Sequence, residues 1–223
     1  MSSMVADSNG SHESVGTESA LSDDVLVLPW WRNPANIAIG AFGVLLLIFA
    51  HGFTVGSGKS DDAHNDSDVG FLQDMRIHHE QALTMSLIYI QTQPESVVLR
   101  TIAYEIIMSQ GTEIGRMVQL LRDFDAAETN ETEQAMVWMG DPTPLEKMPG
   151  LASDEEMKQL QQSRGAEADD VFARLMVTHH KGGVHMAEHA AMHGANDEVK
   201  LMAESMVRAQ TGEIADMEKL LSK

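Results

Sequence analysis

The chain has 223 residues, of which 34 are acidic and 15 basic, so its formal net charge is -19. Nucleic acids are bound by clustered Lys and Arg, so this balance argues against a nucleic-acid partner. The absence of cysteine excludes disulfides and thiolate metal sites.

The N-terminal part of the chain predicts a membrane anchor. Residues 1–33 are polar and acidic, and we expect them to be disordered. Residues 34–56 are mostly apolar and reach the roughly 20 residues that a transmembrane helix needs. Trp30 and Trp31 precede this segment, as is typical of a membrane interface. A cleaved signal peptide is the alternative, and the long acidic leader without a basic start argues against it.

The same region predicts where the rest of the chain lies. Arg32 stands just before the apolar segment, which favours a cytoplasmic N-terminus and a single-pass protein of the cell membrane. The remainder would then lie outside the cytoplasm. Residues 57–67 begin with Gly and Ser and are expected to form a flexible linker.

Residues 68–223 carry apolar side chains at helical spacing, without sustained β-branched alternation. Four helices are expected, at 69–91, 94–125, 168–193 and 198–221. They predict an all-α fold, an antiparallel four-helix bundle. Residues 126–167 would form a crossover linker with a short helix at 155–164, capped by Ser153 and Glu156. We expect the apolar residues of this linker to cover the bundle as a lid: Met136, Trp138, Met139, Met148 and Met157.

The two halves of the bundle region repeat each other. Phe71-x3-Met75-x2-His78-His79-x5-Met85 returns 101 residues later as Phe172-x3-Met176-x2-His179-His180-x5-Met186. Gln110-x2-Glu113-x3-Met117 returns 100 residues later as Gln210-x2-Glu213-x3-Met217. This long period indicates two duplicated helical hairpins rather than a solenoid.

The repeated His, Met and Glu residues are candidate metal ligands, because residues three, four and seven apart share one face of a helix. The candidates are His78, His79, Met85, Glu113 and Met117 in the first half, and His179, His180, Met186, Glu213 and Met217 in the second. Buried His and Glu need partners, and a metal ion would be one. The alternative is a structural network in which Glu113 and Glu213 accept hydrogen bonds from His79 and His180.

A third cluster occurs only in the second half. His185, His189 and His193 follow one another at intervals of four residues, a common spacing for metal chelation. The first-half positions hold Thr84 and Ile88, so the duplication does not require these histidines. On a helix, they would lie on the side opposite Met176 and His179. Their spacing predicts either an exposed metal site or a solvated polar face.

The ligand types predict the metal. Thioether and imidazole without thiolate favour Cu(I), whereas Zn(II) would accept His and Glu but not Met. Iron in a di-iron bundle would need Glu-x-x-His pairs and more carboxylates. Glu80 follows the first histidine pair and Lys181 the second, which breaks such a symmetry. Copper is therefore expected, with zinc and iron as alternatives.

Three segments resemble the bacterial DUF305 family: FLQDMRIHHEQALTMS at 71–86, MPGLASDEEM at 148–157 and FARLMVTHHKGGVHM at 172–186. The resemblance implies a ferritin-like four-helix bundle, often secreted or membrane-anchored. Some members, the CopM-type proteins, are periplasmic copper binders that support copper resistance. For this chain it implies metal handling at His78, His79, Met85, His179, His180 and Met186.

We therefore expect a membrane-anchored protein that binds copper outside the cytoplasm and buffers it or passes it on. The sequence contains no recognisable nucleophile–base pair or nucleotide-binding loop, so an enzyme is not the first expectation. Three alternatives stay open: a ferritin-like di-metal oxidase, a zinc or nickel binder, and a structural bundle without metal.

Overall fold

The computed structural model describes residues 42–44, 46 and 63–222. The chain divides into two units, Met1–Gly58 and Lys59–Lys223, and the helical bundle belongs to the second. The predicted tail at 1–33 lies outside the described residues, as does the predicted membrane segment except for four of its residues. No helix in the described part of the chain is long and apolar enough to cross a membrane.

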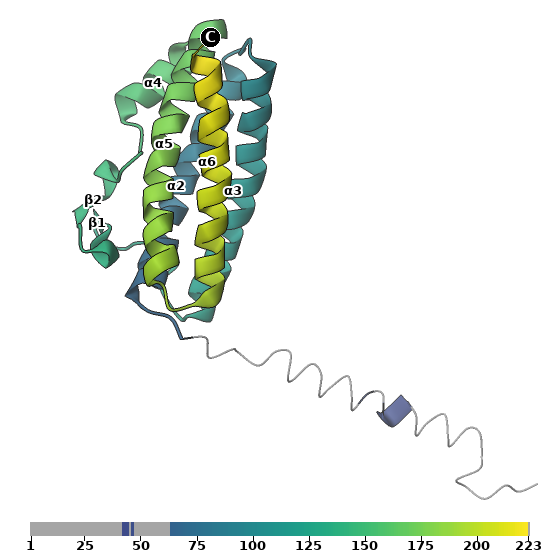
Figure 1. Ribbon diagram of the computed structural model, residues 1–223, viewed down its shortest axis with the longest axis vertical. Helices are drawn as coiled ribbons and strands as arrows, with labels where there is room; N and C mark the ends of the chain where they lie inside the picture. Colours follow the sequence, from purple (N-terminus) through teal and green to yellow (C-terminus); the bar gives the residue numbers. More distant parts are fainter. Residues whose placement is uncertain (1–41, 45, 47–62, 223) are drawn as a thin grey trace, which may run out of the picture. The chain divides into compact units, whose positions relative to one another are not determined.

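Four long helices form the second unit: α2 (Asp66–Gln91), α3 (Val97–Asp123), α5 (Gly165–His193) and α6 (Asp197–Leu221). Figure 1 shows them side by side along one axis, with the linker between α3 and α5 running back along the bundle. The linker returns the chain to the end where α2 finishes, so α2 and α5 run antiparallel. The predicted all-α fold of two helical hairpins joined by a crossover is confirmed.

Polar side chains fix where the helices begin. Asn65 caps α2, accepting from the Asp68 backbone N–H at 3.0 Å while its own N–H donates to the Asp68 carboxylate at 2.8 Å. Ser96 caps α3 by accepting from the Leu99 N–H. The predicted start of this helix at residue 94 is therefore wrong, since Pro94 and Glu95 precede the cap.

The linker contains more structure than the sequence predicts. Its helix α4 (Asp154–Gln162) has the expected capping box between Ser153 and Glu156. Two strands, β1 (Gln134–Ala135) and β2 (Thr143–Pro144), pair antiparallel, beside the short 3₁₀ helices η1 (Val137–Met139) and η2 (Leu145–Lys147). The expectation of no strands is wrong here, because two-residue strands are too short to show alternation.

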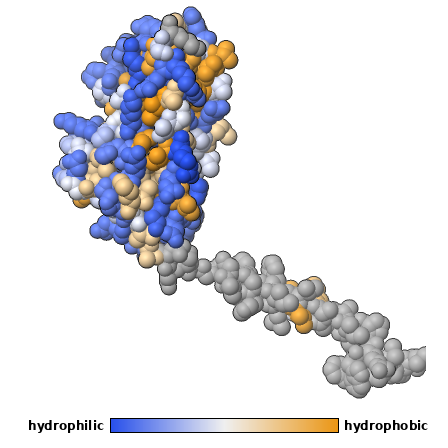
Figure 2. Space-filling view, in the orientation of Figure 1, coloured by the Kyte–Doolittle hydropathy of each residue, from blue (hydrophilic) through white to orange (hydrophobic). Residues whose placement is uncertain are grey.

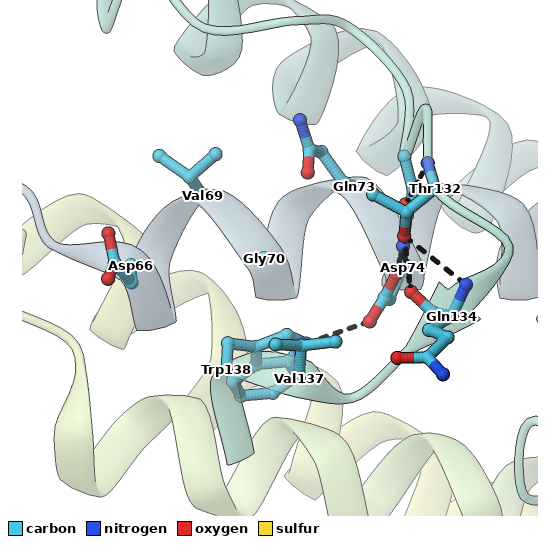
Figure 3. Close-up of a pocket in the computed structure, with 10 residues that line it drawn as sticks. Asp66, Val69, Gly70, Gln73, Asp74, Thr132, Gln134, Val137 and Trp138 are labelled. Atoms are coloured by element: carbon cyan, nitrogen blue, oxygen red, sulfur yellow. Dashed lines mark hydrogen bonds between the residues drawn. The ribbon is translucent and has the colours of Figure 1, made fainter. Parts of the chain in front are cut away.

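One buried carboxylate holds the linker on α2. Asp74 accepts hydrogen bonds from Asn130 Nδ2 at 2.7 Å, from the Met136 backbone N–H at 2.8 Å and from Trp138 Nε1 at 2.8 Å. Figure 3 shows Trp138 against α2 with its bond to Asp74, beside the pocket between α2 and the linker. A side chain at Gly70 would overlap the indole of Trp138. The glycine and the carboxylate together position the lid.

The interior consists of two apolar clusters. The first contains Met75, Met117 and Met186, together with the buried linker residues Met136 and Met148. The second contains the remaining repeated methionines, Met85, Met176 and Met217. Met136 and Met148 are almost fully buried, as the predicted lid requires. On the face shown in Figure 2, hydrophilic residues surround separate hydrophobic patches.

Candidate metal centre

The two histidine pairs meet at the contact between α2 and α5. All four side chains, of His78, His79, His179 and His180, are fully buried. The rings of His78 and His179 lie centroid to centroid at 3.7 Å, with their planes inclined by 34°. The duplication has thus brought the two repeats together across the antiparallel helix pair. Fully buried imidazoles without water must find partners within the protein or on a ligand.

The outer histidine of each pair is bonded to a carboxylate of its own hairpin. His79 Nε2 lies 2.8 Å from Glu113 Oε2, and His180 Nε2 lies 2.5 Å from Glu213 Oε2. A carboxylate oxygen accepts, so each imidazole donates from Nε2, and a neutral ring then has its lone pair on Nδ1. Neither Nδ1 atom has a hydrogen-bond partner. These His–Glu bonds are the ones expected for a purely structural network. Carboxylates also orient metal-binding histidines through bonds of this kind.

The inner histidines are not equivalent. His179 Nε2 donates to the carbonyl oxygen of His78 at 3.0 Å, which leaves its Nδ1 unpaired. The reciprocal bond from His78 is missing: its ring makes no well-formed hydrogen bond, and its nearest polar partner is the backbone of Pro149 in the linker. Gly150 of the linker lies at this place, since a Cβ on it would be 2.6 Å from the His179 carbonyl oxygen. The linker therefore makes the surroundings of His78 differ from those of His179, its counterpart in the second repeat.

Three glycines let the linker and the helices approach the histidines. Gly150 has φ +91°, and a Cβ on it would also lie 3.1 Å from His78 Nε2. A Cβ on Gly182 would overlap the carbonyl oxygen of Pro149, and one on Gly183 would overlap Gln210 Oε1. The segment is held further along by Gln81, whose side-chain amide exchanges two hydrogen bonds with the backbone of Ala152 at 2.7 and 2.9 Å.

Two further polar side chains belong to the same interior. Gln110 and Gln210 are both 3% exposed, and Oε1 of each lacks a hydrogen-bond partner. Gln210 lies beside Gly183, as does the His78 ring, whose Cε1 would be 3.2 Å from a Cβ there. The sequence places the glutamines on the repeated face but does not mark them as site residues. Their recurrence 100 residues apart is the signal that could have identified them.

Methionines lie on both sides of the histidines along α2. Met75 precedes His78 by one turn and packs in the first apolar cluster, whereas Met85 follows by two turns and packs in the second. Methionines that correspond in the two repeats lie in opposite clusters. The first-cluster residues Met75, Met117 and Met186 correspond to the second-cluster residues Met176, Met217 and Met85. Each cluster thus receives three of the repeated methionines, and the first cluster also contains Met136, Met148, Met202 and Met206.

These donors fit a soft ion better than a hard one. Among the described residues, no three or more His, Asp or Glu side chains are arranged to hold a metal. Cu(I) favours thioether donors, so imidazoles one to two helical turns from buried methionines suit it.

Burial keeps the inner imidazoles neutral. Desolvation, and then the neighbouring histidines, lower the pKa of both His78 and His179 well below the usual value of 6.5. A neutral imidazole is the form that binds metals.

The same pKa shifts predict a pH-dependent stability of the metal-free protein. Below pH 6.5 these histidines take up protons in the unfolded chain but not in the folded one, so stability falls as the pH falls. Each can contribute up to about 1.4 kcal/mol per pH unit until its folded pKa is reached. Urea unfolding between pH 7.5 and 5.5 measures the slope. His78→Leu should make it shallower, and an unchanged slope would contradict the assignment.

The third histidine cluster lies elsewhere on α5, as predicted. His185 is exposed, and His189 is partly buried against the edge of Trp138, with ring centroids 5.3 Å apart. Desolvation, followed by the charges of His193 and His185, lowers the pKa of His189. The structure therefore brings His78, His79, His179 and His180 together, and it separates His185 and His189 from them.

The chain matches the family described as Domain of unknown function (DUF305) over residues 68–221. The chain belongs to the DUF305 family. Among solved structures it resembles a putative secreted DUF305 protein from Streptomyces coelicolor, at 35% identity and a TM-score of 0.65, covering 70% of this chain and 92% of that one. A DUF305 fragment from Deinococcus radiodurans is 28% identical with a TM-score of 0.61, covering 71% and 97%.

A third similar structure is named as metal-bound. CopM in the Cu(I)-bound form is 25% identical, with a TM-score of 0.52 and coverage of 70% of this chain and 95% of that one. No curated protein matches the chain. The resemblance predicted from the three sequence segments is confirmed.

Proposed function

We propose that this DUF305 protein binds Cu(I) inside its helical bundle and buffers it or passes it on. His78 carries the proposal, because a fully buried imidazole with no more than a weak contact to the Pro149 backbone is costly unless a ligand completes it. His179 lies against it at 3.7 Å and has an unpaired Nδ1. The likeness to CopM with Cu(I) supports the choice of metal.

Within this proposal the carboxylates orient ligands rather than bind the ion. Glu113 and Glu213 hold His79 and His180 through Nε2 and so present their Nδ1 atoms to the interior. The methionines would supply sulfur from either side, with Met85 and Met186 among them. Bound copper would gain soft ligands in a site closed to water by Gly150 and Pro149.

A structural bundle without metal is the competing function, and the two histidine–glutamate bonds favour it. It accounts for His79 and His180, whose Nε2 atoms are satisfied. It does not account for His78 or for the unpaired glutamine oxygens. A purely structural core would gain nothing from these uncompensated polar groups.

Competition with a chromogenic chelator tests the proposed metal and ligands. Replacing Met85 and Met186 by Leu should weaken Cu(I) binding by at least about tenfold, since even outer-shell changes cost about 10–100-fold. Binding of Zn(II), which does not favour thioethers, should hardly change. The matched control is Met192→Leu, because Met192 is 71% exposed on α5. Equal losses for Cu(I) and Zn(II), or none for either, would count against the thioether ligands.

We also propose that residues 34–56 anchor the protein in the cell membrane, with the N-terminus in the cytoplasm and the bundle outside it. The proposal rests on the apolar run and on Arg32 before it. A phosphatase reporter that is active only outside the cytoplasm, fused after residue 223, should be active. Activity only when it is fused before residue 1 would reverse the topology.

A further inference from the structure

A pair of imidazoles, one partly buried and one exposed, lies on α5 outside the histidine layer. The rings of His189 and His193 stack with centroids 4.0 Å apart and planes inclined by 22°. Nine residues separate His189 from His180, which is about 13 Å along a helix. The corresponding first-half positions hold Ile88 and Thr92. The pair is therefore required neither by the duplicated fold nor by the interior site.

The hydrogen bonding of this pair leaves Nε2 of His193 free to bind a metal ion. His193 Nδ1 donates to the backbone carbonyl oxygen of His189 at 2.9 Å. A neutral ring with this bond has its proton on Nδ1 and its lone pair on Nε2, and the His193 side chain is exposed. A histidine four residues away on a helix is a common second ligand.

The linker supports the pair from one side. Trp138 contacts His189 edge-on at 5.3 Å, and the indole is itself held by its bond to Asp74 (Figure 3). A ligand held by packing loses little freedom on binding, so His189 is fixed in place and the exposed His193 ring turns to direct its lone pair at the same ion. His185 lies one turn earlier on the same helix and is exposed, so a side-chain rotation would bring it toward the pair.

We propose that His189 and His193 form a second, surface metal site for a divalent imidazole-preferring cation such as Cu(II). Imidazole nitrogens suit Cu(II), Ni(II) and Zn(II), whereas the interior thioethers suit Cu(I). The formal charge of -19 raises the concentration of cations near this surface. The site is independent of the interior and exchanges its ion with solvent.

Cu(II) titration of the full chain tests this site through Trp138, with Trp30 and Trp31 replaced by Phe. Cu(II) is a quencher of nearby indole fluorescence, so the parent protein should be quenched as the site fills. His189→Ala with His193→Ala should raise the Cu(II) concentration for half-quenching at least about tenfold, because direct ligands matter no less than outer-shell groups. The control is His64→Ala, because the His64 ring stacks on Phe124. This variant should leave the half-quenching concentration unchanged.

Two further variants separate the possible outcomes. His193→Gln keeps Trp138 packed on His189 and should still weaken quenching if both rings bind. His78→Leu changes only the interior and should leave the surface titration intact. The proposal would be overturned if the double variant or His193→Gln were half-quenched at the same Cu(II) concentration as the parent protein. Loss of quenching in His78→Leu would also overturn it, because the Cu(II) would then occupy the interior.

Discussion

Replacing His78 by leucine should stabilise the metal-free protein and at the same time weaken Cu(I) binding. The buried His78 ring has no more than a weak contact with the Pro149 backbone, and an unsatisfied buried polar group costs about 1–3 kcal/mol. Leucine is of similar size and carries no polar atom, so metal-free stability should rise by up to that amount. The same change removes a proposed ligand, and Cu(I) affinity should fall at least about tenfold. Urea unfolding and chelator competition measure the two effects.

The adjacent histidine is the matched control. His79 donates to Glu113 at 2.8 Å, so His79→Leu removes a hydrogen bond to a charged group, worth about 1.5–3 kcal/mol. This variant should therefore be destabilised without metal. Opposite signs at neighbouring residues distinguish a ligand from a member of a structural network. A clear loss of metal-free stability in His78→Leu would mean that its imidazole is a structural residue after all.

Replacing Gly182 by alanine should destabilise the protein by displacing the linker from the histidines. The added methyl group would overlap the carbonyl oxygen of Pro149, and the next residue, Gly150, contacts His179 and His78. Overpacking of this kind costs about 1–3 kcal/mol, because either the linker or α5 must shift. We expect a lower unfolding midpoint and faster exchange of bound Cu(I), since the linker covers the site. Urea unfolding and the rate of Cu(I) transfer to a chelator measure these effects.

Gly115 in α3 is a matched control for the glycine substitution. It is exposed, and a Cβ there would meet nothing within 4 Å. Alanine is a better helix former than glycine, so Gly115→Ala should stabilise by about 0.5–1 kcal/mol. If Gly182→Ala behaves like Gly115→Ala, then the linker does not seal the histidine layer at this position.

The fold was predictable because long helices show regular apolar spacing and characteristic capping residues in the sequence. The repeat of His, Met and Glu placed both hairpins, and Ser153 with Glu156 marked α4. The start of α3 was missed because apolar spacing alone does not show whether Pro94 or Ser96 begins the helix. The ladder of β1 and β2 was missed because each strand has only two residues, which is too short to show alternation.

The candidate site was predictable in its residue types but not in their roles. Spacing puts Glu113 on the inner face, yet it cannot show whether a carboxylate binds a metal or holds His79. The difference between His78 and His179 arises from Gly150, which is more than 70 residues from His78 in sequence. Gly182 and Gly183 gain their importance from contacts with Pro149 and Gln210, and such close approaches have no local signature.

X-ray absorption at the copper edge of the Cu(I)-loaded full chain, in the His189→Ala and His193→Ala background, tests the central claim most directly. The account predicts a first shell of both nitrogen and sulfur, from the buried imidazoles and thioethers. His78→Leu should reduce the nitrogen contribution. A first shell of oxygen and nitrogen without sulfur, unchanged by His78→Leu, would contradict it.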